Sequence, residues 1–322
     1  MQKKEYSVEI GGKILTAIFT DLAEQAHGSV MLKYGETIVL ATVCMSHDKQ
    51  KGLGYFNLTV DYVEKFYAAG KILGSRFVRR EGKPSEDAIL ASRVIDRTLR
   101  PLFEQSIRHA VQVIVTVISV DDNDPTILAV NAASLALAVS NIPWNGPVGC
   151  VRIGKYDPEG KQASYGAGTD TLVINPFQNL RDEDSKYKFD MTVCGKNGNI
   201  NMIEASAHQT SEAELEQALT RASEEIAKIE DFQKKIVAEI GKEKRVIEKE
   251  VIDGASVKLF NENILPKMEG AIFAGAGKKK IDELHNVWNK MVAEAYPERE
   301  DFTLEDNLFD DTENDILHKK AI

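Results

Sequence analysis

The most distinctive segment of the chain spans residues 61–103 and reads DYVEKFYAAGKILGSRFVRREGKPSEDAILASRVIDRTLRPLF. Between residues 65 and 100 it carries nine Lys or Arg and four acidic side chains, a local charge of about +5 in a chain of formal charge −10. Its first part mixes aromatic residues with glycines, as suits a loop that lays rings and cations along a flexible chain of bases and phosphates. A basic segment in an acidic protein predicts an anionic partner.

The second part of this segment predicts a helix. Ser85 fits the N-cap position, and Glu86 and Asp87 complement the positive charge of a helix start. Leu90 and Val94 then supply an apolar face.

Three arginines share another face of the same helix. Arg93, Arg97 and Arg100 follow at spacings of four and three, so their guanidinium groups project together. Like charges at this spacing repel unless something negative neutralises them. The alternative interpretation is a solvated surface helix in which Asp96 and Arg100 form an ion pair one turn apart.

The residues before this segment predict two pairs of strands. Residues 6–10 and 13–19 flank paired glycines, which is typical of a hairpin. Residues 28–33 and 37–45 predict a second pair. The run TIVLATVCM at residues 37–45 is apolar on both faces, so we expect a central strand there.

The residues after the segment alternate between strands and helices. Residues 111–120, VQVIVTVISV, predict a buried strand, and the Ala-rich residues 127–140 predict a helix that is covered on nearly all sides. Further strands are expected at residues 148–153, 171–174, 189–194 and 200–205. This mixed order implies an α+β arrangement of sheets and helices.

Three carboxylates lie within four residues at Asp121, Asp122 and Asp124. One interpretation is a metal site. The other is a turn that caps the next helix, which we favour because Asp and Asn before proline commonly form such turns.

The character of the sequence changes from Ser211, where a capping box with Glu214 opens a long amphipathic helix. Residues 294–315 hold ten acidic side chains and one arginine, which predicts a solvated or loosely ordered face. Such a face repels nucleic acid and leaves the basic segment free to bind it.

The composition describes a globular protein. The chain has 322 residues, 43% hydrophobic and 28% charged, enough for two domains. It has neither a long apolar run nor the apolar core of a signal peptide, so we expect a cytoplasmic protein without membrane contact. Cys44, Cys150 and Cys194 each lie in an apolar run and are expected to be buried thiols.

The basic segment also carries a family resemblance. The first core domain of bacterial polynucleotide phosphorylases shows an FFRR loop, then EGRPSE, then a helix that ends in IDRxxRPLF. Here the corresponding residues are FVRR at 77–80, EGKPSE at 81–86 and IDRTLRPLF at 95–103. A run of this length with fixed spacing is more specific than a short motif. The family's GxTxVL pattern is similar to residues 35–40.

The resemblance implies the fold and the function. The expected fold class is α+β, with a ribonuclease PH-like (ribosomal protein S5 domain 2-like) core of mixed sheets and helices at residues 1–232. An all-helical linker domain at residues 233–322 is expected to follow. The implied function is the N-terminal half of a 3′-to-5′ phosphorolytic exoribonuclease that acts in mRNA degradation, converting RNA and phosphate reversibly into nucleoside diphosphates. This half is expected to guide RNA and form the ring rather than catalyse.

The resemblance also implies the site. The expected RNA contacts are Phe77, Arg79, Arg80, Lys83, Arg93, Arg97 and Arg100. Val78 replaces one stacking ring of the family's loop, so affinity is expected to rest more on the arginines. Neither a catalytic residue nor a metal ligand is expected in this chain, because the stretch at 185–197 has the single carboxylate Asp190 after the basic Lys188. Mg²⁺ is implied for the full-length enzyme only.

The partners implied are single-stranded RNA, inorganic phosphate for the full-length enzyme, a homotrimeric ring, and an RNA-degradation complex with an endoribonuclease and a helicase. The family continues into a second core domain, a KH domain and an OB-type domain, and this sequence stops before them. Two alternatives from other classes stay open. One is a stand-alone module that docks an acidic protein surface, and the other is an enzyme that binds a small phosphorylated ligand in the basic cleft.

Overall fold

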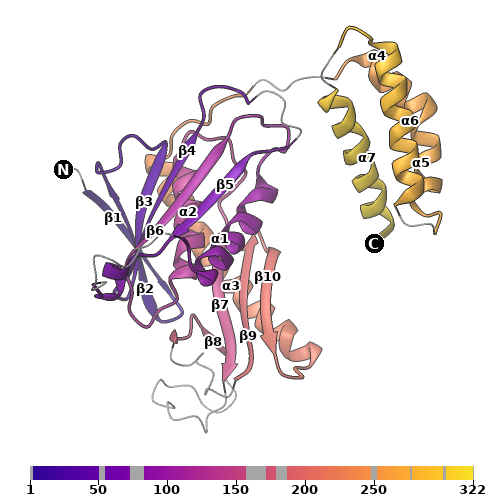
Figure 1. The fold of residues 1–322 in the computed structure, drawn as a ribbon. Coiled ribbons are helices and arrows are strands. Elements are labelled where there is room, and N and C mark those ends of the chain that lie inside the picture. The colour runs from indigo at the N-terminus through magenta and orange to yellow at the C-terminus, as the bar shows by residue number, and fades with distance from the viewer. Residues whose placement is uncertain are drawn as a thin grey trace. The chain divides into compact units, whose positions relative to one another are not determined.

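The computed structural model describes residues 3–50, 55–72, 83–156, 172–178, 187–247, 252–275, 278–299 and 302–321 (Figure 1). The chain divides into two compact units. The core unit comprises residues 1–48, 57–104 and 109–246, and the helical unit comprises residues 49–56, 105–108 and 247–322.

The core unit contains a six-stranded sheet in the order β1-β2-β3-β4-β6-β5. Its strands are β1 (Lys3–Ile10), β2 (Lys13–Thr20), β3 (Gly28–Tyr34), β4 (Thr37–Met45), β5 (Leu58–Val63) and β6 (Val111–Ser119). Neighbouring strands are antiparallel except β5 and β6, which run parallel. Both predicted strand pairs are therefore confirmed, and β4 is central because it pairs with β3 and β6.

A second sheet of four strands has the order β10-β9-β7-β8. Its strands are β7 (Gly149–Tyr156), β8 (Leu172–Ile174), β9 (Tyr187–Lys196) and β10 (Asn199–Ala207). All its neighbours are antiparallel. The four strands predicted after residue 148 are confirmed.

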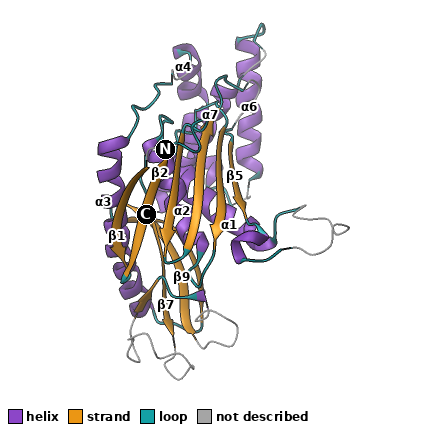
Figure 2. Cartoon of the chain, turned by 90° about the vertical axis from the view of Figure 1, so that its left-hand side faces the viewer, coloured by secondary structure: helices purple, strands orange, loops and turns teal. Residues whose placement is uncertain are grey.

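Helix α2 (Pro125–Val139) lies between the two sheets (Figure 2). It packs on β3, β4 and β6 of the first sheet and on β7 of the second. Every residue from Ile127 to Val139 is buried, as predicted for an apolar helix covered on nearly all sides. Helix α1 (Glu86–Leu99) packs on β5 and α2, and helix α3 (Glu212–Ile240) packs on β7 and β9.

Only one face of β4 is fully covered. Val39, Ala41 and Val43 are buried, whereas Cys44 is exposed, because successive side chains point to opposite faces of a sheet and α2 covers one of them. The prediction that Cys44 is buried is therefore wrong. Cys150 and Cys194 are buried, as expected.

One element differs from the sequence analysis. Residues 58–63 form strand β5, although the start of the basic segment is interpreted there as a loop, and Tyr62 is buried in this strand.

The acidic residues 294–315 were expected to form a solvated or loosely ordered face. Residues 303–315 lie in the helix α7 (Thr303–Ala321), which has Glu305 and Asp306 in its first turn, where acidic side chains favour helix formation. Asp310, Asp311 and Asp315 of this helix are exposed.

The helical unit is built from α4 (Gly254–Asn263), α5 (Leu265–Ile272), α6 (Lys279–Ala295) and α7. Its core centres on Trp288, which packs edge-on against Phe260. No helix in the described parts of the chain has the length and apolarity that a bilayer crossing requires.

The core unit extends beyond the domain boundary drawn from the sequence at residues 232 and 233. Helix α3 continues without a break to Ile240, and residues 242–246, here called the strap, return to the end of α2. The Lys242 amide donates to Val139 O at 3.0 Å and the Arg245 amide to Asn141 O at 2.8 Å.

The ammonium group of Lys244 is the main polar contact of the strap. It donates to the carbonyl oxygens of Leu137, Ala138 and Ser140 at 2.8, 3.0 and 2.7 Å, at the end of α2 where backbone acceptors are left over. Burial lowers the pKa of Lys244 to about 8, so the group still carries a positive charge at pH 7. A cation at a helix C-terminus is favourable.

Replacing Lys244 with Met should lower the free energy of unfolding by about 1–3 kcal/mol, because buried carbonyls lose a charged donor while the apolar stem is kept. Urea unfolding at pH 7 measures the change. Lys235→Met, at an exposed position of α3, is the matched control and should change stability by less than about 0.5 kcal/mol. Equal stability of the two variants would show that the strap does not hold α2.

Candidate functional site

Helix α1 begins as the sequence predicts. The Ser85 hydroxyl accepts a hydrogen bond from the Ala88 amide at 3.0 Å, which makes Ser85 the N-cap. The buried side of the helix includes Val94, Ile95 and Leu99. Leu90 was expected on this side but is 55% exposed.

The three arginines of α1 differ in their exposure and in their ion pairs. Arg93 and Arg97 are exposed, and no described acidic side chain pairs with either guanidinium group. Arg100 instead binds Asp96, with Nη2 at 2.6 Å from Oδ1 and Nε at 2.9 Å from Oδ2, and Nη2 also donates to Leu58 O at 3.1 Å. Arg100 therefore ties α1 to β5, while Arg93 and Arg97 remain available to an anionic partner.

A cleft of about 770 Å³ lies beside the start of α1. Three lysines, Lys65, Lys71 and Lys83, line it together with the carboxylates of Glu64 and Asp121. Phe66, which is 43% exposed, also lines it. Of the residues expected to contact RNA, the structure thus brings Lys83 to a basic cleft that contains further lysines. The expected contacts Phe77, Arg79 and Arg80, and the replacement Val78, lie outside the described residues.

The acidic turn before α2 is structural, which confirms the favoured interpretation. Asp121 accepts hydrogen bonds from the Thr37 hydroxyl at 2.5 Å and the Glu36 amide at 2.7 Å, and so anchors the turn between β3 and β4. Gly35 in that turn has φ of +62°, and a side chain there would collide with Asp121 and Asn123. Burial alone would raise the pKa of Asp121, but these hydrogen bonds lower it below its ordinary value.

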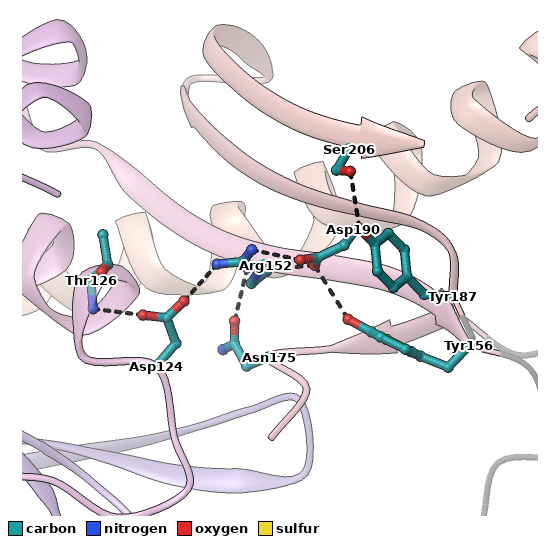
Figure 3. A network of polar contacts seen from close by, with 8 residues as sticks. All are labelled: Asp124, Thr126, Arg152, Tyr156, Asn175, Tyr187, Asp190 and Ser206. Atoms are coloured by element: carbon teal, nitrogen blue, oxygen red, sulfur yellow. Dashed lines mark hydrogen bonds and ion pairs between the residues drawn. The ribbon is translucent and has the colours of Figure 1, made fainter. Parts of the chain in front are cut away.

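Asp124 caps α2 and joins a network of buried polar side chains (Figure 3). One oxygen of Asp124 accepts from the Thr126 amide at 2.8 Å. The other binds Arg152 Nη1 at 2.7 Å. Arg152 comes from β7 and also binds Asp190 of β9, with Nε at 2.8 Å from Oδ1 and Nη2 at 2.5 Å from Oδ2. Tyr156 donates to the same Asp190 at 3.2 Å.

One guanidinium group therefore faces two carboxylates. Burial disfavours the charged form of Arg152, but the hydrogen bond to Asp190 and the charges of Asp124 and Asp190 outweigh it and raise the pKa of Arg152 above its ordinary value. The side chains of both aspartates are 9% exposed. With one guanidinium group against two carboxyl groups, the network has one formal negative charge in excess.

This network forms one wall of a second cleft of about 510 Å³, which also contains Glu64, Asp87 and Glu204. The cleft is therefore anionic and repels phosphate groups. Sequence reasoning missed Arg152. The available signal was a single arginine in the apolar strand GCVRIG, in a chain that also has one aspartate in the apolar strand KFDMTVC.

The residues in this cleft do not fit a magnesium ion. Both oxygens of Asp190 accept from Arg152, and Asp124 is divided between Arg152 and the start of α2. Within the described parts of the chain, no group of three or more His, Cys, Asp or Glu side chains is arranged to hold a metal.

The chain is similar to known proteins over its whole length. Residues 16–143 match the 3′ exoribonuclease family, domain 1. Polyribonucleotide nucleotidyltransferase of Caldicellulosiruptor bescii is 43% identical over 253 residues, which cover 78% of this chain and 34% of that protein. The enzyme of the same name from Syntrophomonas wolfei is 34% identical over 99% of this chain and 43% of its own length.

The chain therefore spans less than half the length of these relatives. Among solved structures, the crystal structure of rice Rrp46 superposes with a TM-score of 0.53, covering 69% of this chain and 94% of that one at 18% identity. At this identity the likeness concerns the fold alone. It confirms the expected fold class, a ribonuclease PH-like core, and the helical unit follows that core in the chain.

Replacing Arg152 with Met should lower the free energy of unfolding by about 3–5 kcal/mol, because Asp124 and Asp190 lose their shared counter-charge. Urea unfolding at pH 7 measures the loss.

Arg93→Met on α1 is the matched control, because Arg93 is exposed and no described acidic side chain pairs with it. It should cost at most about 1 kcal/mol. Similar losses for the two variants would contradict the buried role of Arg152. Adding Asp190→Asn to Arg152→Met should restore part of the loss.

Proposed function

Because the chain carries domain 1 of the 3′ exoribonuclease family and is homologous to the N-terminal portion of polyribonucleotide nucleotidyltransferases, we propose that it is the RNA-guiding half of a 3′-to-5′ phosphorolytic exoribonuclease. In the reaction proposed for the whole protein, inorganic phosphate attacks the terminal phosphodiester of RNA. A nucleoside diphosphate leaves, and the shortened RNA keeps a free 3′ end. The reaction is reversible, because it exchanges a phosphodiester bond of the RNA for the diphosphate bond of the released nucleotide.

The observation that carries this proposal is the contrast between two kinds of arginine. Arg93 and Arg97 are exposed on α1 and have no described acidic partner, close in sequence to the lysine-lined cleft. Arg152 of β7 is neutralised by two carboxylates, Asp190 of the neighbouring strand β9 and Asp124 at the start of α2. The outer cations are free to bind phosphates, whereas the inner one is not.

RNA guidance follows from these outer groups. Each phosphate that a Lys or Arg neutralises releases condensed counterions, which favours binding independently of base sequence. Phe66 and Tyr67 are 43% and 57% exposed in the turn beside Lys65, so they offer rings on which bases can stack. This combination suits a single strand that passes along the protein and is not read base by base.

The chemistry is assigned to the part of the protein beyond this chain. A transferring phosphoryl group needs positive charge, and the 510 Å³ cleft presents an excess of carboxylates. The carboxylate of Asp124 also occupies the start of α2, where an anion would otherwise be favoured. We therefore propose that the catalytic residues of the whole protein, its magnesium and its phosphate site lie in another domain.

The remaining parts of the proposal concern the assembly. By homology the whole protein acts in the cytoplasm on mRNA as a homotrimeric ring. It is further proposed to join an RNA-degradation complex with an endoribonuclease and a helicase. The exposed arginines of α1 and residues 77–80 would then line the path of the RNA toward the catalytic half.

Changing Arg93 and Arg97 together to Ala should weaken binding of single-stranded RNA about equally for all sequences. The dependence of log affinity on log salt should flatten by about 1.4, because two phosphate contacts are lost at about 0.7 each. Fluorescence anisotropy at several salt concentrations measures this. Thermal unfolding should hardly change, since both side chains are exposed.

Arg100→Ala is the informative comparison. It should reduce stability, because Asp96 loses its partner, and should leave the salt dependence nearly unchanged. Arg79→Ala with Arg80→Ala extends the test to the loop. If none of these changes alters RNA affinity, the basic segment docks an acidic protein instead. Saturable competition by a mononucleotide would indicate a small-ligand site.

The purified chain should release no nucleoside diphosphate from RNA, phosphate and Mg²⁺, because Arg152, the cation that lines the 510 Å³ cleft, is already neutralised by Asp124 and Asp190. Thin-layer chromatography of radiolabelled RNA measures product. The reverse reaction, polymerisation from nucleoside diphosphates, should be absent too. Clear turnover that survives repurification of the chain would place catalytic groups in this half.

A further inference from the structure

The two buried thiols of the core unit face each other across the second sheet. Cys150 of β7 and Cys194 of β9 are direct partners in the antiparallel register, and both are 0% exposed. They lie 44 positions apart in the sequence, so their pairing arises from the fold alone. Neither the proposed RNA guidance nor the Arg152 network uses them.

The hydrogen-bond pattern shows which kind of strand pair they form. The Cys150 amide donates to Asn131 Oδ1 at 2.9 Å, and Cys150 O accepts from Asn131 Nδ2 at 2.8 Å. Both backbone groups of Cys150 therefore point to α2 and away from β9. Arg152 repeats the pattern two residues later, with its amide and carbonyl bound to Asn175.

Cys150 and Cys194 are thus a non-hydrogen-bonded pair. In such pairs the Cα atoms lie about 4.5 Å apart and the side chains approach most closely. A disulfide spans Cα distances of about 4.4–6.8 Å, so the backbone already has the spacing that an S–S bond needs.

The pair lies next to a cleft that reaches solvent. Arg152 and Thr192 form the next non-hydrogen-bonded pair on the same face of the sheet, and both line the 510 Å³ anionic cleft. A small neutral molecule in this cleft is one strand pair away from the sulfur atoms. Anionic reagents are repelled by the carboxylates that line the cleft.

We propose that Cys150 and Cys194 form a redox-modification site, a reversible cross-strand disulfide made by hydrogen peroxide. In the first step one sulfur attacks a peroxide oxygen. The O–O bond breaks, water leaves, and a sulfenic acid remains. The second sulfur then attacks the sulfenic sulfur, the S–S bond forms, and the hydroxyl leaves with the second thiol's proton as water. Two thiols and one peroxide give one disulfide and two waters.

The environment makes this reaction slow and selective. Burial raises the pKa of Cys150, and the neighbouring Cys194 and Asp124 raise it further, while Arg152 opposes them. Thiols held in the protonated form react slowly with peroxide. The exposed Cys44 on the other sheet reacts first and has no cysteine facing it across the ladder, where Gln112 is its partner.

Once formed, the disulfide holds β7 to β9 beside the pair that carries Arg152. The bond would restrict separation of the two strands at the position where the guanidinium group links them. Reduction by a dithiol would restore the two thiols. The redox state of the two cysteines would therefore determine how firmly β7 is held to β9.

The test uses the full chain with all three cysteines. The folded protein is treated with hydrogen peroxide, quenched with catalase, alkylated in denaturant and digested without reductant for mass spectrometry. We expect a peptide that joins residues 150 and 194, with loss of two hydrogen atoms, and its disappearance on treatment with dithiothreitol. Oxidation in denaturant is the control and should give all three pairings of the cysteines.

A folded sample in which Cys44 is oxidised while Cys150 and Cys194 are both recovered as alkylated thiols, even after prolonged exposure, would overturn the proposal. So would separate oxidation of the two sulfurs to sulfinic acids. Cys194→Ala keeps the site small and removes one sulfur, so it should abolish the linked peptide and leave a dimedone-reactive Cys150. The linked peptide of the unaltered chain decides the question even if this variant folds poorly.

Discussion

The fold of the core unit depends on the complete burial of α2. An uninterrupted run of buried residues from Ile127 to Val139 leaves this helix no solvated face, so two sheets must cover it. Its polar interior groups are satisfied by the elements around it, as when Asn131 binds both backbone groups of Cys150 and Ser134 binds Gln233 of α3. Strand β7 and helix α3 are thereby positioned against α2 by hydrogen bonds as well as by apolar contact.

Most of the secondary structure could be predicted from the sequence, because its signals are local. The apolar run of α2, the glycine turn between β1 and β2 and the Ser85 cap need only neighbouring residues. Strand β5 was missed because its pairing with β6 is parallel and brings together residues about fifty positions apart. Cys44 was misplaced because an apolar run does not tell which face of a sheet a helix covers.

The candidate site, too, could be predicted only where its signals are local in the sequence. The basic face of α1 could be predicted, and so could the pair of Asp96 with Arg100 one turn apart, which the alternative interpretation named. That Arg93 and Arg97 stay exposed depends on where each side chain points. Arg152 and Asp190 meet only because β7 and β9 are adjacent. An exposed arginine on a helix and an arginine that carboxylates neutralise inside the fold look alike in a sequence. The first can bind RNA phosphates, and the second cannot.

The strap after α3 has a consequence for how the chain can be divided. The end of α3 resembles a domain boundary at which the chain could be truncated, because a long helix ends there and an irregular segment follows. However, Lys244, whose ammonium group binds the carbonyl oxygens at the end of α2, lies after residue 240. Truncation at residue 240 would therefore remove a part of the core unit. The modular joint of the molecule lies after Val246, and any exchange of the helical unit between relatives must carry the strap with the core.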